Sequence, residues 1–79
     1  MAQNLSDLIS ARIRKANFGK ILDVRVSEVQ LDPKGGLSTT FESNRCSLVR
    51  QKHVHLDPSK VKALFQGKKN PNLDAQFRL

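Results

Sequence analysis

The 79-residue sequence predicts a small α+β domain in the order helix, strand, strand, strand, helix, with an antiparallel three-stranded sheet. Apolar residues recur at helical spacing near the start and again after residue 57, whereas they alternate with polar residues in between. Turn-forming residues separate the alternating runs. A chain of this length makes one domain, expected at residues 1–69, and the mostly polar residues 70–79 are expected to be a tail that packs loosely or becomes ordered on a partner.

The first helix is predicted between Leu5 and Ala16, where the apolar residues form one stripe. Asn4 can cap its start, because a short polar side chain can accept a hydrogen bond from the first unpaired amides. Residues Asn17, Phe18 and Gly19 are expected to end it. Gly19 suits the left-handed conformation that helix ends often adopt, and Phe18 is expected to fold back onto the stripe.

Three strands follow, and each is predicted from apolar residues at every second position. The first runs to Leu31, but its apolar positions change phase, so a bulge near Ser27 and Glu28 is expected. Residues 32–36 carry proline and two glycines and predict a hairpin turn, after which the second strand begins. In the third strand, residues 46–56, Arg50 and Lys52 share a face with apolar residues, so these cations either lie past the core or face a functional surface.

The second helix begins at Asp57 and Pro58, an N-cap residue followed by the residue best suited to the first helical position. Gly67 is expected to end it. Of the four phenylalanines, those at positions 18, 41 and 65 fit apolar stripes and are predicted to be buried. Phe77 lies in the expected tail and is the one aromatic side chain predicted to anchor a partner.

The charge is uneven along the chain. The formal net charge is +7, and residues 1–44 hold six basic and five acidic side chains, whereas residues 45–69 hold seven basic side chains against Asp57. A strand and a helix that both present cations are typical of surfaces that neutralise phosphates. The sequence therefore predicts a nucleic-acid-binding module, for DNA or RNA, largely without sequence readout. The predicted contact residues are Arg45, Arg50, Lys52, Lys60, Lys62, Lys68 and Lys69.

The alternative is a small protein-interaction factor, an inhibitor or assembly protein, that docks on an acidic protein through the same cations or by strand addition at the third strand. A homodimer would enlarge the small core. His53 and His55 are expected to add positive charge to the basic face when they protonate below about pH 6.5.

Other classes of function are not expected. No assembled catalytic constellation is found, so the chain is not predicted to be an enzyme or to hold a cofactor. Cys46, His53 and His55 are too few ligands for a zinc site, and no metal is expected. A single cysteine favours a reducing compartment and a cytoplasmic location. The first helix could lie on a membrane, but its stripe is needed in the core, so no membrane partner is expected.

Overall fold

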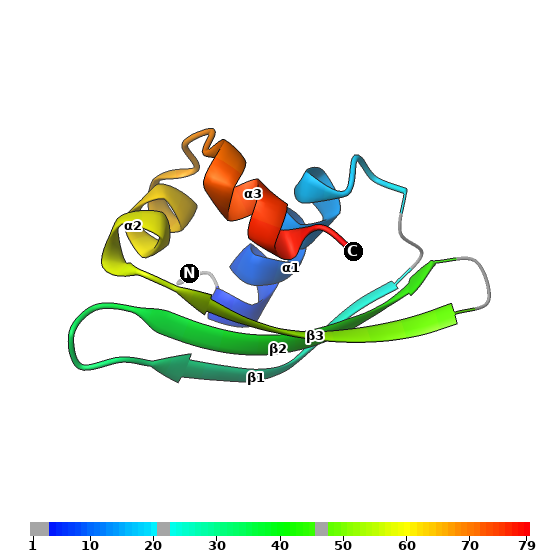
Figure 1. Cartoon of the computed structure of the whole chain (residues 1–79), viewed down its shortest axis with the longest axis horizontal. Helices are drawn as coiled ribbons and strands as arrows, with labels where there is room; N and C mark the ends of the chain where they lie inside the picture. The colour runs from blue at the N-terminus through cyan, green and yellow to red at the C-terminus, as the bar shows by residue number, and fades with distance from the viewer. Residues whose placement is uncertain (1–3, 21–22, 46–47) are drawn as a thin grey trace.

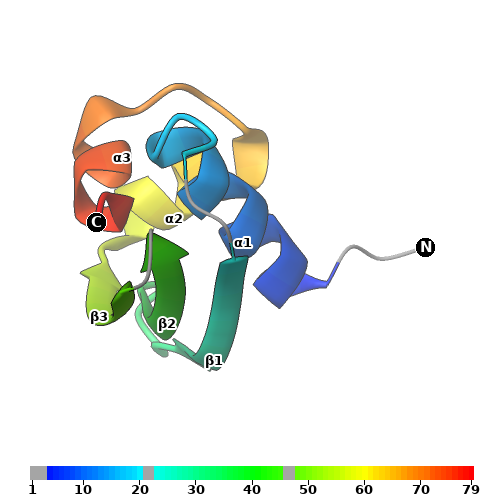
Figure 2. The ribbon, with the colours of Figure 1, turned by 90° about the vertical axis from the view of Figure 1, so that its right-hand side faces the viewer.

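The computed structural model describes residues 4–20, 23–45 and 48–79 and has two layers. The lower layer is an antiparallel sheet in the order β1-β2-β3, built from Asp23–Leu31, Leu37–Arg45 and Leu48–Leu56. The upper layer contains α1 (Leu5–Ala16), α2 (Pro58–Gln66) and α3 (Pro71–Phe77), and all three helices lie on the same side of the sheet (Figures 1 and 2). The predicted α+β class and the order of its first five elements are confirmed.

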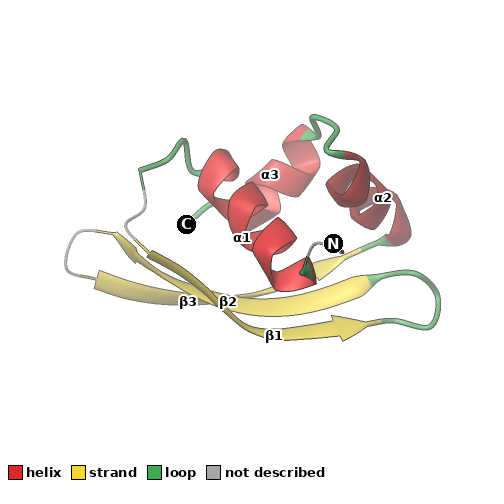
Figure 3. Ribbon diagram, turned by 180° about the vertical axis from the view of Figure 1, so that it is seen from behind, coloured by secondary structure: helices red, strands yellow, loops and turns green. Residues whose placement is uncertain are grey.

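Among the described residues, no helix lies on the opposite side of the sheet, as the view from behind also shows (Figure 3). Strand positions therefore separate into a covered face and an open face, because successive side chains of a strand point in opposite directions. On β2 the covered positions are Leu37, Thr39, Phe41 and Ser43, all of which are buried. This separation decides which of the predicted site residues lie together.

The sheet has the predicted bulge and hairpin turn. The β1–β2 register shifts between Val26 and Glu28, which keeps Val29 on the same face as Val26 despite the change of phase in the sequence. The connection from residue 32 to residue 36 closes with Gly35 at φ 96°. Gly36 is needed for a different reason, because a Cβ there would lie 2.9 Å from the carbonyl oxygen of Leu56.

The core lies between the covered face and the helices. Ile9 and Ile13 of α1 are fully buried against the sheet layer together with Leu64 of α2. Phe41 meets Phe77 of α3 edge to face, with 5.9 Å between ring centroids, a favoured geometry for an aromatic pair. None of the helices within the described residues is long and apolar enough to cross a membrane.

Residues 70–79 differ from the expected loose tail. They contain α3, which begins with an Asn70 side chain that accepts a 3.0 Å hydrogen bond from the Leu73 amide and with Pro71 in the first turn. Leu73 and Phe77 are both fully buried. Phe77 is therefore a core residue and not an anchor for a partner, because a short helix can bury two large side chains even when its other positions are polar.

Two of the three phenylalanines predicted to be buried are exposed. Phe41 is fully buried as expected, but Phe18 is 72% exposed and Phe65 is 56% exposed. Phe65 follows the buried Leu64 on α2 and lies at the edge of the apolar stripe, outside the contact with the sheet. Phe18 points outward because of the local backbone at the end of α1, which is described below.

Candidate nucleic-acid interface

Arg50 and Lys52 lie on the covered side of β3. Their partners on β2 are Ser43 and Phe41, both buried beneath the helices. Since β3 is an edge strand, these long side chains can leave the core sideways and keep their charges near water. Arg50 is exposed, and the Lys52 ammonium donates a 2.9 Å hydrogen bond to the carbonyl oxygen of Arg78.

The lysines predicted on the second helix do not share one face. Lys62 is exposed, whereas Lys60, two positions earlier, is half-buried, because residues two apart on a helix point in nearly opposite directions. Lys68 and Lys69 are exposed in the connection from α2 to α3. Arg45 is the last residue of β2, and its side chain lies outside the described part of the structure.

The fold adds Lys15 to this group, although the sequence placed it far away. A hollow between α1 and the end of α2 is lined by Lys15, Arg12 and Gly67 among others, so Lys15 lies beside the turn that precedes Lys68. We call the four exposed lysines of α1, α2 and the α2–α3 connection the helix-layer lysines. They are Lys15, Lys62, Lys68 and Lys69.

Arg12 positions this region from inside the protein. Its side chain is only 6% exposed, its Nε donates to Asp74 Oδ1 at 2.9 Å, and its Nη2 donates to the carbonyl oxygen of Lys68 at 2.7 Å. One guanidinium thus ties α1 to both α3 and the α2–α3 connection. Arg12 is a structural cation and not a free one, because its charge is already paired with Asp74.

A second group of cations, apart from the helix-layer lysines, lies near Phe18 at the end of α1. The Phe18 amide donates to the carbonyl of Lys15 and the Gly19 amide to that of Arg14, at 3.1 and 2.9 Å. These are the two hydrogen bonds of a Schellman turn, in which glycine normally occupies the first left-handed position. Here Phe18 occupies it with φ 58°, which costs roughly 1–2 kcal/mol for a residue with a Cβ.

The Phe18 ring has a cation beside it. The guanidinium carbon of Arg78 lies 5.3 Å from the ring centroid, within the range of a cation–π interaction. A hollow of about 250 Å³ is lined there by Phe18, Lys20 and Arg78 with neighbouring residues of both chain segments. We call Phe18, Lys20, Lys52 and Arg78 the C-terminal corner.

Asn17 holds this corner together. Its Nδ2 donates to the carbonyl oxygens of Ile13 and Phe77 at 2.8 and 2.9 Å, and its Oδ1 accepts from the Leu79 amide at 2.9 Å. The side chain is buried, so these hydrogen bonds form in place of contacts with water. Because Asn17 binds the residues on both sides of Arg78, the Arg78 backbone is fixed beside Phe18.

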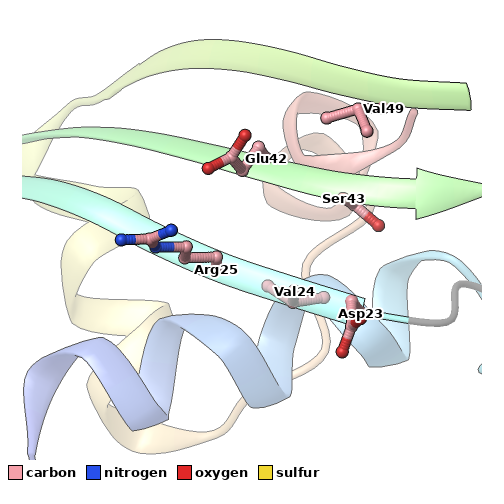
Figure 4. Close-up of a pocket in the computed structure, with 6 residues that line it drawn as sticks. All are labelled: Asp23, Val24, Arg25, Glu42, Ser43 and Val49. Carbon is pink, nitrogen blue, oxygen red and sulfur yellow. The ribbon is translucent and has the colours of Figure 1, made fainter.

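The open face of the sheet has the opposite character. Among the described side chains, register places Asp23, Glu28 and Glu42 on this face with one arginine, Arg25. Figure 4 shows Arg25 beside Glu42 at a hollow of about 390 Å³ that Asp23 also lines. Carboxylates at such a hollow repel phosphates, so it is not a candidate for anion binding.

The two histidines lie on this open face and not with the predicted basic residues. His53 pairs with Thr40 across the sheet, and its Nδ1 is 2.8 Å from the Thr40 Oγ1. His55 Nε2 is 4.0 Å from Asp32 Oδ2. The expectation that both would add charge to the face of Arg50 and Lys52 is wrong, because adjacent strand residues point to opposite sides of a sheet.

No group of three or more histidine, cysteine, aspartate or glutamate residues within the described ranges could hold a metal ion. Cys46, the third ligand considered, lies outside those ranges. Comparisons with protein-family models, with curated proteins and with solved structures found no match to this chain. A functional proposal therefore depends on the chemistry of the surface.

Proposed function

We propose that this protein binds nucleic acid through its helix layer and the adjoining β3 edge, mainly by contacts to phosphates and largely without sequence readout. The observation that carries the proposal is the division of charge between the two sides of the molecule. Three carboxylates face one guanidinium on the open side of the sheet. The exposed cations of the described residues on the other side are Arg14, Lys15, Lys20, Arg50, Lys62, Lys68, Lys69 and Arg78.

Most of these cations are available for phosphates. Within the described residues, the only ion pair at 4.0 Å or less is Arg12 with Asp74, and the one histidine–carboxylate contact, His55 with Asp32, is an ion pair only if the imidazole is protonated. Neither involves an exposed cation of the helix layer. A flexible lysine that meets a phosphate releases condensed counterions, which favours binding without any base contact. The acidic open face would turn away from the polyanion and thereby orient the protein.

The test compares two pairs of charge removals. Lys68→Gln with Lys69→Gln removes two cations from the helix layer, and Arg25→Gln with Lys34→Gln removes two exposed cations from the sheet layer. Binding of a duplex DNA and an oligothymidylate is measured by fluorescence anisotropy over a range of salt concentrations. The proposal predicts a steep log–log salt slope, reduced by about one for each helix-layer lysine removed and unchanged in the matched control.

A salt slope near zero for the unaltered protein would contradict the proposal. Equal losses of affinity in the helix-layer variant and the sheet-layer variant would contradict it too. Polyglutamate is included as a competitor because an acidic protein surface is the alternative partner. Displacement of nucleic acid by polyglutamate at equal charge concentration would favour the protein-interaction alternative. If binding is driven by the release of counterions condensed on closely spaced phosphates, a polypeptide with a different charge spacing should compete poorly.

A further inference from the structure

Phe18 breaks a local rule without contributing to the core. It takes a left-handed position that suits glycine, and its ring is 72% exposed. A strained residue that buries little surface does not stabilise the fold, so the strain points to a use of the exposed side chain. The same turn at the end of α2 is made by Gly67 at φ 67°, so a turn of this type forms without an aromatic residue.

The ring has a cationic neighbour whose backbone is fixed. Arg78 lies against it at 5.3 Å from the centroid, and the Arg78 backbone is fixed from both sides by the hydrogen bonds of Asn17. Lys52 also binds the Arg78 carbonyl oxygen at 2.9 Å. A ring positioned by a folded framework loses little freedom when a ligand stacks on it, which increases affinity.

The ligand chemistry follows from the C-terminal corner as a whole. An exposed aromatic ring with Lys20 and Arg78 at the same hollow, and with Lys52 bound to the Arg78 carbonyl oxygen, suits a ligand with a flat π-system and nearby negative charge. A nucleotide within a single strand has both, because its base is free to stack and its phosphates lie close to that base. Bases of a duplex are already stacked on one another and offer no free face.

We propose that Phe18 is a stacking platform for an unpaired base, with the cations of the C-terminal corner contacting the adjacent phosphates. This inference rests on the proposed nucleic-acid binding and narrows its ligand to single-stranded segments. It also gives different roles to two regions on the same side of the molecule, the helix-layer lysines and the C-terminal corner. The helix-layer lysines attract any phosphate backbone, and the C-terminal corner distinguishes a strand that carries unpaired bases from one that does not.

The direct test uses fluorescence. The chain contains no tryptophan, so Phe18→Trp introduces a single reporter at the proposed platform, and Phe65→Trp places a matched reporter on another exposed aromatic position. Each protein is titrated with an oligothymidylate of about twelve nucleotides and with an abasic oligonucleotide of the same length. We expect the oligothymidylate to quench the emission at position 18 and the abasic strand to leave it unchanged, with no base-dependent quenching at position 65.

Affinity provides a second, independent readout. Phe18→Asn removes the ring but keeps a residue that tolerates the left-handed conformation, whereas Phe18→Tyr keeps the ring. Loss of one stacked base should weaken oligothymidylate binding roughly tenfold in Phe18→Asn, with abasic binding unchanged and Phe18→Tyr close to the unaltered protein. Phe65→Asn is the matched control and should bind both strands normally. Circular dichroism checks that each variant is folded.

The outcomes separate the two proposals. If the unaltered protein binds both strands equally and Phe18→Asn changes neither affinity, the stacking inference is wrong while the phosphate-binding function stands. If duplex DNA binds at low salt but neither single strand does, the stacking inference is wrong while the phosphate-binding function stands. If neither the single strands nor the duplex binds at low salt, the nucleic-acid function itself fails. If polyglutamate, and not oligothymidylate, changes the emission of the tryptophan at position 18, the corner is a protein contact and the inference is overturned.

Discussion

The ends of α1 and α2 show how one backbone turn can be used in two ways. Both ends make the same pair of hydrogen bonds, since Gly67 binds the carbonyl of Leu64 and Lys68 that of Ala63, just as Phe18 and Gly19 do with residues 15 and 14. Gly67 takes the left-handed position without a steric cost, and nothing would contact a Cβ added there within 4 Å. Phe18 takes the equivalent position with strain.

The difference between the two ends suggests that they serve different purposes. The α2 end stabilises the fold and is held by Arg12, whose guanidinium binds the carbonyl oxygen of Lys68. The α1 end presents a ring to solvent and is held by Asn17. An exposed residue in a backbone conformation that its side chain disfavours indicates selection for something other than stability. The following predictions test this comparison, from the largest expected effect to the smallest.

Arg12 should matter most for stability, because it holds the α2 end. Arg12→Met keeps much of the side-chain packing but leaves the Asp74 carboxylate, which is 18% exposed, without its partner. We expect the free energy of unfolding to fall by roughly 3 kcal/mol, as when a mostly buried ion pair is broken from one side. Urea denaturation measures it, and a loss of less than about 1 kcal/mol would show that the pair does not anchor α2 and α3.

Asn17 should have the next largest effect, and it should affect binding as well. Asn17→Ala leaves the Phe77 carbonyl and the Leu79 amide without their partner, so we expect a loss of about 2 kcal/mol in the free energy of unfolding. Affinity for oligothymidylate should also fall, because Arg78 is no longer fixed beside Phe18. Asn72 is exposed on α3, and Asn72→Ala should change stability by no more than about 0.5 kcal/mol. Equal effects of the two substitutions would contradict the role of Asn17.

Exchanging the residue types of the two turns tests the comparison directly. Gly67→Ala introduces strain into the α2 end and should lower the free energy of unfolding by roughly 1–2 kcal/mol. Phe18→Gly relieves the same strain but loses a cation–π contact worth about 0.5–1 kcal/mol, so a net gain of about 0.5–1 kcal/mol is expected. Equilibrium unfolding in urea measures both, with unchanged m-values. A destabilised Phe18→Gly would mean that the ring supports the fold.

The N-terminal ends of the same two helices extend the comparison to pH. Asn4 caps α1 with an amide, whereas Asp57 caps α2 with a carboxylate. The hydrogen bond from the Lys60 amide, followed by that from the Ser59 hydroxyl, lowers the pKa of Asp57 below its ordinary value of 3.8. A lowered pKa in the folded state means that the cap stabilises the protein above that ordinary value and that this contribution is lost as pH falls through the lowered pKa.

The expected pH effect is small, because Asp57 is exposed. Between about pH 5 and pH 3, the Tm of the unaltered protein should fall more than that of Asp57→Asn, whose cap does not titrate. Thermal denaturation followed by circular dichroism measures the two curves. Asp7 lies in the first turn of α1 and is not a cap, so Asp7→Asn should retain the acid dependence of Asp57. Parallel curves for Asp57→Asn and the unaltered protein would show that the cap makes no such contribution.

Features set by neighbouring residues could be predicted from the sequence. The Asp57 cap, the proline that follows it and the Gly67 turn were all predicted, because each requires only a local conformation. The bulge between Val26 and Glu28 followed from the change of phase in the apolar positions. The third helix was missed, although Asn70 and Pro71 repeat the cap-and-proline pattern of α2, because seven residues with two large apolar side chains do not form a helix by themselves.

The candidate site was less predictable than the fold. From the sequence, Lys60 was grouped with Lys62, and the two histidines with Arg50 and Lys52, because the members of each group are neighbours in the chain. Helix and strand geometry separates them. Lys15 and Arg78 were not among the predicted contact residues, since only the packing of α1 against α2 and α3 brings them to the site.

The sequence by itself determined the first five elements, the turns between them and a strong excess of positive charge, because caps, periodicity and composition are local or additive properties. Only the tertiary structure decided which side of the sheet is covered, and hence that the open face is acidic and the helix side cationic. It also decided that Phe77 is buried while Phe18 is exposed. Burial depends on contacts between segments far apart in the chain, and such contacts leave no fixed spacing in the sequence.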